Sequence, residues 1–176
     1  LDKNNYKKAQ FLLYLSMVYR EMGNYEKAKN LLDKTYRIYQ NYYSECPLKI
    51  AQILGQLGHF YDDYGDYQKA KNLLEKSLII HQKHFSENPI GVARMSRNLG
   101  MLYRRLGYYE KAKTLFIQSL KIYRENLSEN DIGMSWSTLQ LGNIYRILGD
   151  YKKSKKILEN CYKVNKEIFS KDHICV

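Results

Sequence analysis

The chain has 176 residues, of which 44% are hydrophobic, 14% aromatic and 27% charged, with a net charge of +11. This composition is typical of one or two folded domains and excludes an intrinsically disordered chain. No stretch approaches the ~20 consecutive apolar residues of a membrane-spanning helix, and residues 1–10 lack the layout of a secretory signal, so we expect a cytoplasmic protein. The excess of basic residues favours acidic partners: anionic peptides, nucleic acid or an anionic membrane face.

The cysteines Cys46, Cys161 and Cys175 are odd in number and widely spaced. They form no CxxC pair and no Cys/His grouping, so the sequence supports neither a disulfide framework nor a zinc site. We expect reduced thiols and no bound cofactor or metal.

A Gly-x-Tyr-x-Lys-small-Lys string begins at Gly23 and recurs at Gly65, Gly107 and Gly149, a step of 42 residues each time. A Leu-small-x-x-Tyr pattern lies upstream of each copy and keeps the same step. Its copies are 15–19, 57–61, 99–103 and 141–145. Two motifs in register four times indicate four structural repeats, at about 6–47, 48–89, 90–131 and 132–173.

Within a repeat the apolar spacing is helical: Leu12, Leu15 and Tyr19 form one stripe, and Ala28, Leu31 and Leu32 form another. Each repeat is therefore predicted to be two helices, with the first stripe facing the partner helix. The first helix should end at the motif glycine, which accepts left-handed geometry. Small residues on both helices predict a close approach of their backbones. These residues are Ser16, Gly58, Gly100 and Gly142 on the first helices, and Ala28, Ala70, Ala112 and Ser154 on the second.

These motifs resemble the tetratricopeptide repeat family over essentially the whole chain: Leu-Gly-x-x-Tyr, then Gly-x-Tyr, then Ala, then a bulky residue. The bulky residues are Leu32, Leu74, Phe116 and Leu158. The 42-residue step exceeds the family's usual 34 and is more similar to the kinesin light chain subclass, with second helices running on to about 43 and 85. The resemblance implies an all-α, right-handed superhelix of four helix-turn-helix repeats.

The chain begins inside an inter-repeat loop without an initiator methionine, and it stops where a fifth first helix would begin. We expect it to be a fragment of a longer array. Neither end carries a plainly polar capping helix, so self-association through the uncapped ends is expected.

In the family the first helix of each repeat lines a concave groove. The adjacent face of these helices should therefore be the groove here, and its residues vary between repeats where the scaffold does not. They are Gln10, Leu13, Tyr14, Met17 and Arg20; Gln52, Gln56, His59 and Asp62; Arg94, Arg97, Asn98, Met101 and Arg104; and Trp136, Leu139, Gln140, Asn143 and Arg146.

The third repeat places Arg94, Arg97, Asn98 and Arg104 on roughly one helix face, with forked donors suited to carboxylates. Amides at Gln56, Asn98 and Gln140 recur one repeat apart, at a place where the resembled family holds the backbone of an extended peptide. Kinesin light chain members take short acidic peptides with an aromatic anchor. The sequence thus predicts an adaptor, scaffold or sensor arm that binds an acidic peptide, and a solvated polar face is the alternative.

The only tryptophan, Trp136, falls on the predicted groove stripe. It is either an anchor contact or packing between the third and fourth repeats. Tyr36, Tyr39, Tyr42 and Tyr43 on one second helix are interpreted as inter-repeat packing.

Lysines at the start of each second helix offer a different function, a basic ridge for nucleic acid or an anionic membrane. They are Lys27, Lys29, Lys69, Lys71, Lys111, Lys113, Lys153, Lys155 and Lys156. By repeat the net charge is +3, 0, +4 and +4, so the ridge is interrupted and charge for solubility is favoured. A structural, self-assembling repeat scaffold is a further alternative.

No catalytic motif is present, and we predict that the chain is not an enzyme. His81 and His84 are interpreted as surface histidines. The grouping of His59 with Asp62 and Asp63 has metal-ligand residue types, but we do not predict a metal site there.

Overall fold

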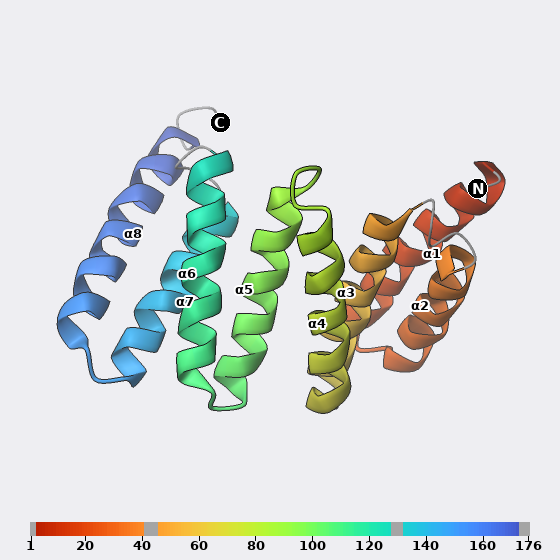
Figure 1. The fold of residues 1–176 in the computed structure, drawn as a ribbon, viewed down its shortest axis with the longest axis horizontal. Coiled ribbons are helices and arrows are strands. Elements are labelled where there is room, and N and C mark those ends of the chain that lie inside the picture. The colour runs from red at the N-terminus through yellow and green to blue at the C-terminus, as the bar shows by residue number, and fades with distance from the viewer. Residues whose placement is uncertain (1–2, 41–45, 128–131, 173–176) are drawn as a thin grey trace. The chain divides into compact units, whose positions relative to one another are not determined.

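The computed structural model describes residues 3–40, 46–127 and 132–172, and throughout these ranges the regular secondary structure is α-helical (Figure 1). The chain divides into two compact units, Leu1–Phe85 and Ser86–Val176. We call them unit 1 and unit 2 and describe each by itself. None of the described helices is long and apolar enough to cross a membrane.

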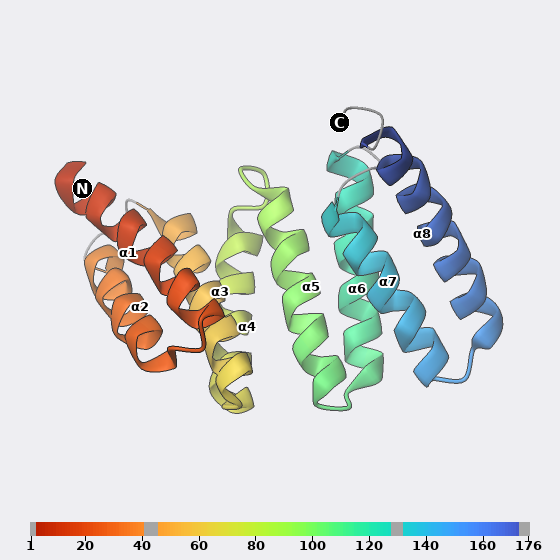
Figure 2. The same ribbon diagram turned by 180° about the vertical axis from the view of Figure 1, so that it is seen from behind.

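Unit 1 contains α1 (Lys3–Glu21), α2 (Tyr25–Gln40), α3 (Pro47–Tyr64) and α4 (Tyr67–Lys83). Unit 2 contains α5 (Pro89–Arg105), α6 (Tyr109–Asn126), α7 (Ile132–Ile147) and α8 (Tyr151–Asp172). Within each unit every helix packs against the next along the chain, and the first and third helices also touch (Figures 1 and 2). The prediction of an all-α helical repeat fold is confirmed. The helix α4 ends at Lys83, two residues short of the expected position, and the predicted end of the preceding long helix at 43 lies outside the described residues.

Each helix pair turns at the motif glycine, as predicted. Gly65 has φ +91°, in the left-handed region that an L side chain enters only with strain, and its N–H donates to the carbonyl of Asp62. The next residue caps the second helix: the Asp66 carboxylate accepts from the backbone N–H of Lys69 at 3.2 Å. Asn24 and Asp150 do the same in their repeats, whereas Tyr108 of the third repeat makes no side-chain cap and Gly107 still turns at φ +81°, so the glycine is what the four turns share.

The small residues of the motif lie where the two helices of a repeat cross. A Cβ built on Gly58 would lie 2.6 Å from Cγ of Leu74, and one on Gly142 would lie 2.6 Å from Cδ2 of Leu158. At Gly100 the facing atoms belong to the Phe116 ring, the nearest at 3.0 Å. The predicted close approach is confirmed, and it is set by the bulky motif residue on the partner helix.

Buried side chains of both helices in each pair form the cores. Tyr39, Phe60 and Ile53 are among the largest enclosed side chains of unit 1, and Phe116, Leu102 and Ile144 have this role in unit 2. Tyr36 packs at the edge of the unit 1 core, so Tyr36 and Tyr39 are packing residues as interpreted, whereas Tyr42 and Tyr43 lie outside the described residues.

Three predictions about burial are wrong. Leu15, expected to be covered by its partner helix, is 45% exposed, whereas Leu57, its counterpart one repeat on, is buried. Leu57 belongs to α3, which packs against α2, and no helix precedes α1 in the described chain to cover Leu15. Leu13, predicted to line the groove, is buried in the unit 1 core. His81 is not a surface histidine, since only 1% of its surface is exposed.

Candidate functional site

The first helices of unit 2 carry a strongly cationic surface. Across their full lengths α5 and α7 contain no acidic residue. We call Arg94, Arg97 and Arg104 of α5, with Arg146 of α7, the arginine face. The helices α5 and α7 touch, so these side chains come from neighbouring elements of one unit. Nothing on the two helices offsets their charge.

The predicted groove residues of unit 2 divide into an exposed and a buried set. Arg94 and Arg146 are exposed, and Arg97, Met101, Arg104 and Asn143 are half-buried. The two amides lie deeper, with Asn98 6% and Gln140 8% exposed. Their depth was not predicted, because spacing along a helix defines a face but not how closely the neighbouring helix covers it.

Trp136 is 51% exposed, so within unit 2 it is not enclosed by packing. Leu139, one turn along α7, is also exposed. Together they place apolar surface on the same helix as Gln140 and Arg146.

Two polar atoms of this surface have no partner. Among the described residues nothing hydrogen-bonds to Nε of Arg104 or to Oε1 of Gln140, although both atoms are buried. A buried polar atom without a partner costs about 1–3 kcal/mol, and most native proteins have few of them. Nη2 of Arg97 donates to Oδ1 of Asn98 at 3.5 Å, the outer limit of a hydrogen bond.

The internal repeats show what Arg104 lacks. In unit 1, Nε of Arg20 on α1 lies 3.5 Å from Oδ2 of Asp63 on α3. Two repeats on, Arg104 of α5 stands in the place of Arg20, and Ile147 of α7 in the place of Asp63. The same scaffold therefore neutralises this arginine in unit 1 and leaves it without an acid in unit 2.

The corresponding surface of unit 1 is different in character. Gln52, Gln56, His59 and Asp62 are half-buried on α3, where Asp62 and Asp63 outnumber the one lysine. The cavity that Gln10, Tyr14 and Gln52 help to line has a volume of about 20 Å³, room for about one water molecule. In the described part of the chain no three metal-ligating side chains come together, at His59 and its aspartate neighbours or elsewhere.

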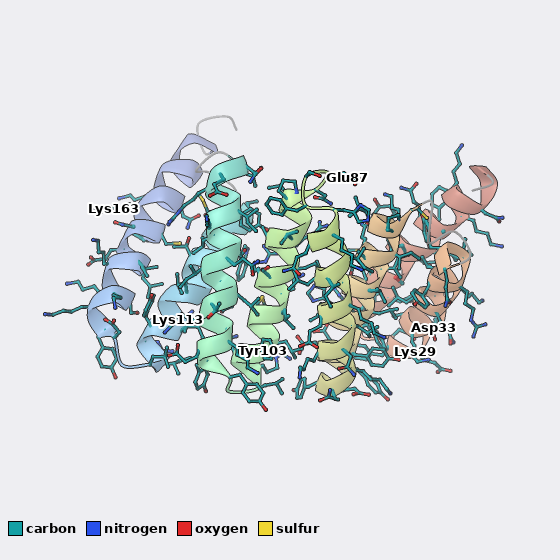
Figure 3. All side chains as sticks on the ribbon, viewed as in Figure 1. Lys29, Asp33, Glu87, Tyr103, Lys113 and Lys163 are labelled. Carbon is teal, nitrogen blue, oxygen red and sulfur yellow. The ribbon has the colours of Figure 1, made fainter. Side chains whose placement is uncertain are left out.

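The lysines of the predicted ridge are held by the scaffold. The ammonium groups of Lys27, Lys69, Lys111 and Lys153 each lie 5.2–5.5 Å from the ring centre of the motif tyrosine of their own repeat. Figure 3 shows Lys29 beside Asp33, and their charged atoms are 2.9 Å apart. Sequence reasoning missed these contacts, although the constant spacing of Tyr and Lys in all four repeats was a signal for them.

Hydrogen bonds shift the pKa of several of these groups. The bond from Lys69 lowers the pKa of Asp66, and the bond to Asp66 raises the pKa of Lys69. Asp150 and Lys153 repeat the pattern. Burial raises the pKa of the Cys161 thiol, which keeps it protonated and poorly nucleophilic.

Four helix pairs with one repeated motif define an α-helical repeat protein. The sequence matches the tetratricopeptide repeat family over residues 7–83 and 91–167, and the chain belongs to that family. Stacked repeats of this kind are scaffolds for protein interaction, with extended binding surfaces on their helices. No curated protein sequence matches the chain.

Several solved structures share the fold. BtubC (BKLC) from P. vanneervenii is 22% identical with a TM-score of 0.80, covering 91% of this chain and 64% of that one. A putative kinesin light chain from Podosopora anserina is 23% identical with a TM-score of 0.69, covering 91% and 76%. A Rap protein complexed with Competence and Sporulation Factor is 21% identical with a TM-score of 0.80, covering 95% and 45%. The similarity to kinesin-light-chain-type repeats is thus confirmed for the fold, and the chain spans less than two thirds of BtubC.

Proposed function

We propose that unit 2 binds an extended acidic peptide segment across the arginine face. The observation that carries the proposal is the loss of the acidic partner at Ile147, which leaves Arg104 without the ion pair that Arg20 makes in unit 1. A ligand carboxylate would supply the missing charge, and guanidinium groups bind carboxylates through two parallel hydrogen bonds.

The amides and the exposed aromatic residue add to this specificity. An extended peptide presents backbone N–H donors, and Oε1 of Gln140, which is buried without a partner among the described residues, would reach one by rotation of its side chain. Trp136 is exposed on the same helix, and Trp is a frequent anchor residue at interfaces. Met101 and Asn143 lie half-buried on the two helices and would line the bound segment. The Rap protein complexed with Competence and Sporulation Factor supports the use of this fold for ligand binding.

An adaptor or scaffold role follows from such a site, because a repeat protein without its own chemistry acts by holding a partner. The rival function, phosphate binding along the lysine ridge, is less favoured. Lys29, Lys69 and Lys153 already pair with aspartates, so a phosphate backbone would have to displace internal ion pairs.

The test uses a fluorescein-labelled peptide of about ten residues, rich in glutamate with one central tyrosine, and a matched peptide with glutamine for glutamate. We expect the glutamate peptide to bind and Arg97→Glu to weaken it about tenfold or more, with an unchanged circular dichroism spectrum and melting temperature. Arg124→Glu on α6 is the matched control for lost positive charge. Equal binding of the glutamine peptide, or equal loss in both variants, would show that the arginine face is not the site.

A further inference from the structure

Unit 2 has a second surface with its own chemistry, which none of the arginine-face residues lines. Two adjoining pockets, about 500 and 530 Å³ in volume, share Arg124, Thr138 and Asn160 among their lining residues. One wall is α6, the other is α8, and the floor is α7, which lies between them in Figure 2. We call this the α6–α8 groove.

The floor and lower walls of the groove are apolar. Ile117 and Leu120 come from α6, Leu141 and Tyr145 from α7, and Ile157 from α8. Leu120 and Leu141 are themselves buried, but Ile117 is 45% exposed and presents its side chain to the open groove. A partner that covers Ile117 would remove apolar surface from water.

The rim is cationic. Lys121 and Arg124 line one side, and Lys153 and Lys156 line the other. The single acid among the lining residues, Glu125, lies 4.0 Å from Lys121.

Two of these rim cations have no acidic partner within the described part of unit 2. Lys153 is paired with Asp150 at 2.8 Å, whereas no acid of the described residues pairs with Arg124 or Lys156. The unbalanced charges thus lie on opposite walls, either side of an apolar floor.

We propose that the α6–α8 groove is a docking site for an amphipathic helix of a partner protein, one whose apolar stripe is flanked by glutamates or aspartates. Such a helix would lay its apolar stripe on Leu120, Leu141 and Ile117 and place carboxylates beside Arg124 and Lys156. Helix-in-groove recognition requires only one stripe of the ligand to be buried, which suits a groove open along one side. This site is independent of the peptide site on the arginine face.

Other occupants fit the groove less well. An acyl chain in an open groove would leave much of its surface in water, and a nucleic acid backbone would leave the apolar floor uncovered. A second copy of this chain has the wrong charge. Its exposed apolar residues Phe11, Leu15 and Val18 on α1 follow Lys7 and Lys8, and Ile132, Trp136 and Leu139 lie on α7, which contains no acidic residue.

The related groove of unit 1 differs from the α6–α8 groove in its lining cations. It has a volume of about 470 Å³ and is lined by Tyr36, Leu54 and Ile79, among others. There Gln40 stands in the place of Arg124, two repeats earlier, so the α2 wall contributes no cation, and the lining lysines, Lys76 and Lys83, lie on the α4 wall alone. We therefore assign the acidic helix to unit 2.

The experiment is a fluorescence anisotropy titration of the full chain with a labelled helical peptide of about eighteen residues, with leucines on one face flanked by glutamates. Two control peptides are matched in length: one has lysine for each glutamate, and one has the same composition in scrambled order. We expect only the first peptide to bind saturably.

Two variants locate the site. Ile117→Ser and the double variant Arg124→Glu/Lys156→Glu should each weaken binding about tenfold or more, while Arg97→Glu leaves it unchanged. All these side chains are at least partly exposed, so the fold should survive, as circular dichroism will check.

Several results would overturn the proposal: no saturable binding, equal binding of the scrambled or lysine peptide, or no effect of the groove variants. Loss of binding in Arg97→Glu alone would move the helix to the arginine face. Two more results would assign the groove to another occupant and reject the partner helix. One is a concentration-dependent mass in sedimentation that Ile117→Ser abolishes, and the other is binding of phosphatidylglycerol vesicles that requires Arg124 and Lys156.

Discussion

The crossing of α3 and α4 can be tested by adding one carbon atom. In Gly58→Ala the new Cβ would lie 2.6 Å from Cγ and 2.8 Å from Cδ2 of Leu74. Carbon atoms pack best at about 3.5–4.0 Å, so Leu74 must move by roughly 1 Å. Only 1% of the Leu74 surface is exposed, and it therefore has no solvent side to move into.

Two opposing contributions to the free energy of unfolding decide the effect of Gly58→Ala. Overpacking a core costs about 1–3 kcal/mol, and replacing glycine by alanine within a helix returns about 1 kcal/mol. We expect Gly58→Ala to lower the free energy of unfolding by about 1 kcal/mol. With m about 1–3 kcal/mol/M, the urea midpoint should fall by about 0.3–1 M. The matched substitution Gly100→Ala meets Phe116 at 3.0 Å, a milder contact, and its two terms should nearly cancel.

Urea unfolding followed by circular dichroism measures the effect, and a double-mutant cycle isolates its cause. In a Leu74→Ala background the clashing atoms are absent, so Gly58→Ala should instead stabilise the protein by about 1 kcal/mol. A higher midpoint for Gly58→Ala alone, or the same loss in both backgrounds, would refute the idea that contact with Leu74 requires the glycine.

Two further predictions concern charge. Ile147→Asp should give Arg104 the acidic partner that Arg20 has in unit 1. Because the new aspartate competes with the ligand for Arg104, we expect the glutamate peptide to bind about three- to tenfold more weakly. Unchanged affinity in the same titration would contradict this. The Asp66 and Asp150 carboxylates have lowered pKa values, so their stabilising effect exists above the ordinary value of 3.8 and disappears as the pH falls through the folded-state pKa. Asp66→Asn/Asp150→Asn should therefore be less stable than the wild type in urea at pH 7, and the difference should shrink as the pH falls below 3.8. A difference that does not shrink in acid would contradict the assignment.

The repeat register accounts for most of what the sequence could predict about the fold. Glycine turns, helix pairs and the crossing at Gly58 all follow from motifs that recur at a fixed step, because each copy meets the same neighbours. The same register would have corrected the error at His81. Its counterparts Tyr39 and Tyr123, one repeat before and after, are buried aromatic residues. They predict the burial of His81 better than the polarity of histidine does.

Other features could not be read from the sequence because they depend on contacts between repeats. Leu15 repeats the motif of Leu57, but its exposure depends on whether another helix covers it. The burial of Asn98 and Gln140 likewise depends on how closely neighbouring helices pack. Helical periodicity identifies the face of a residue, whereas burial is a property of the assembled unit.

The contrast between Asp63 and Ile147 shows that an acidic residue at this position is not needed for folding. Both residues stand at the same place in the same scaffold, and both units form the same helix pairs, so the fold does not require an acid there. In unit 1 the ion pair with Arg20 is internal, whereas in unit 2 Ile147 offers Arg104 no carboxylate, and in the proposed function the ligand supplies it. A repeat protein can create a binding site in this way, by removing the internal partner of a side chain that the scaffold already holds in position.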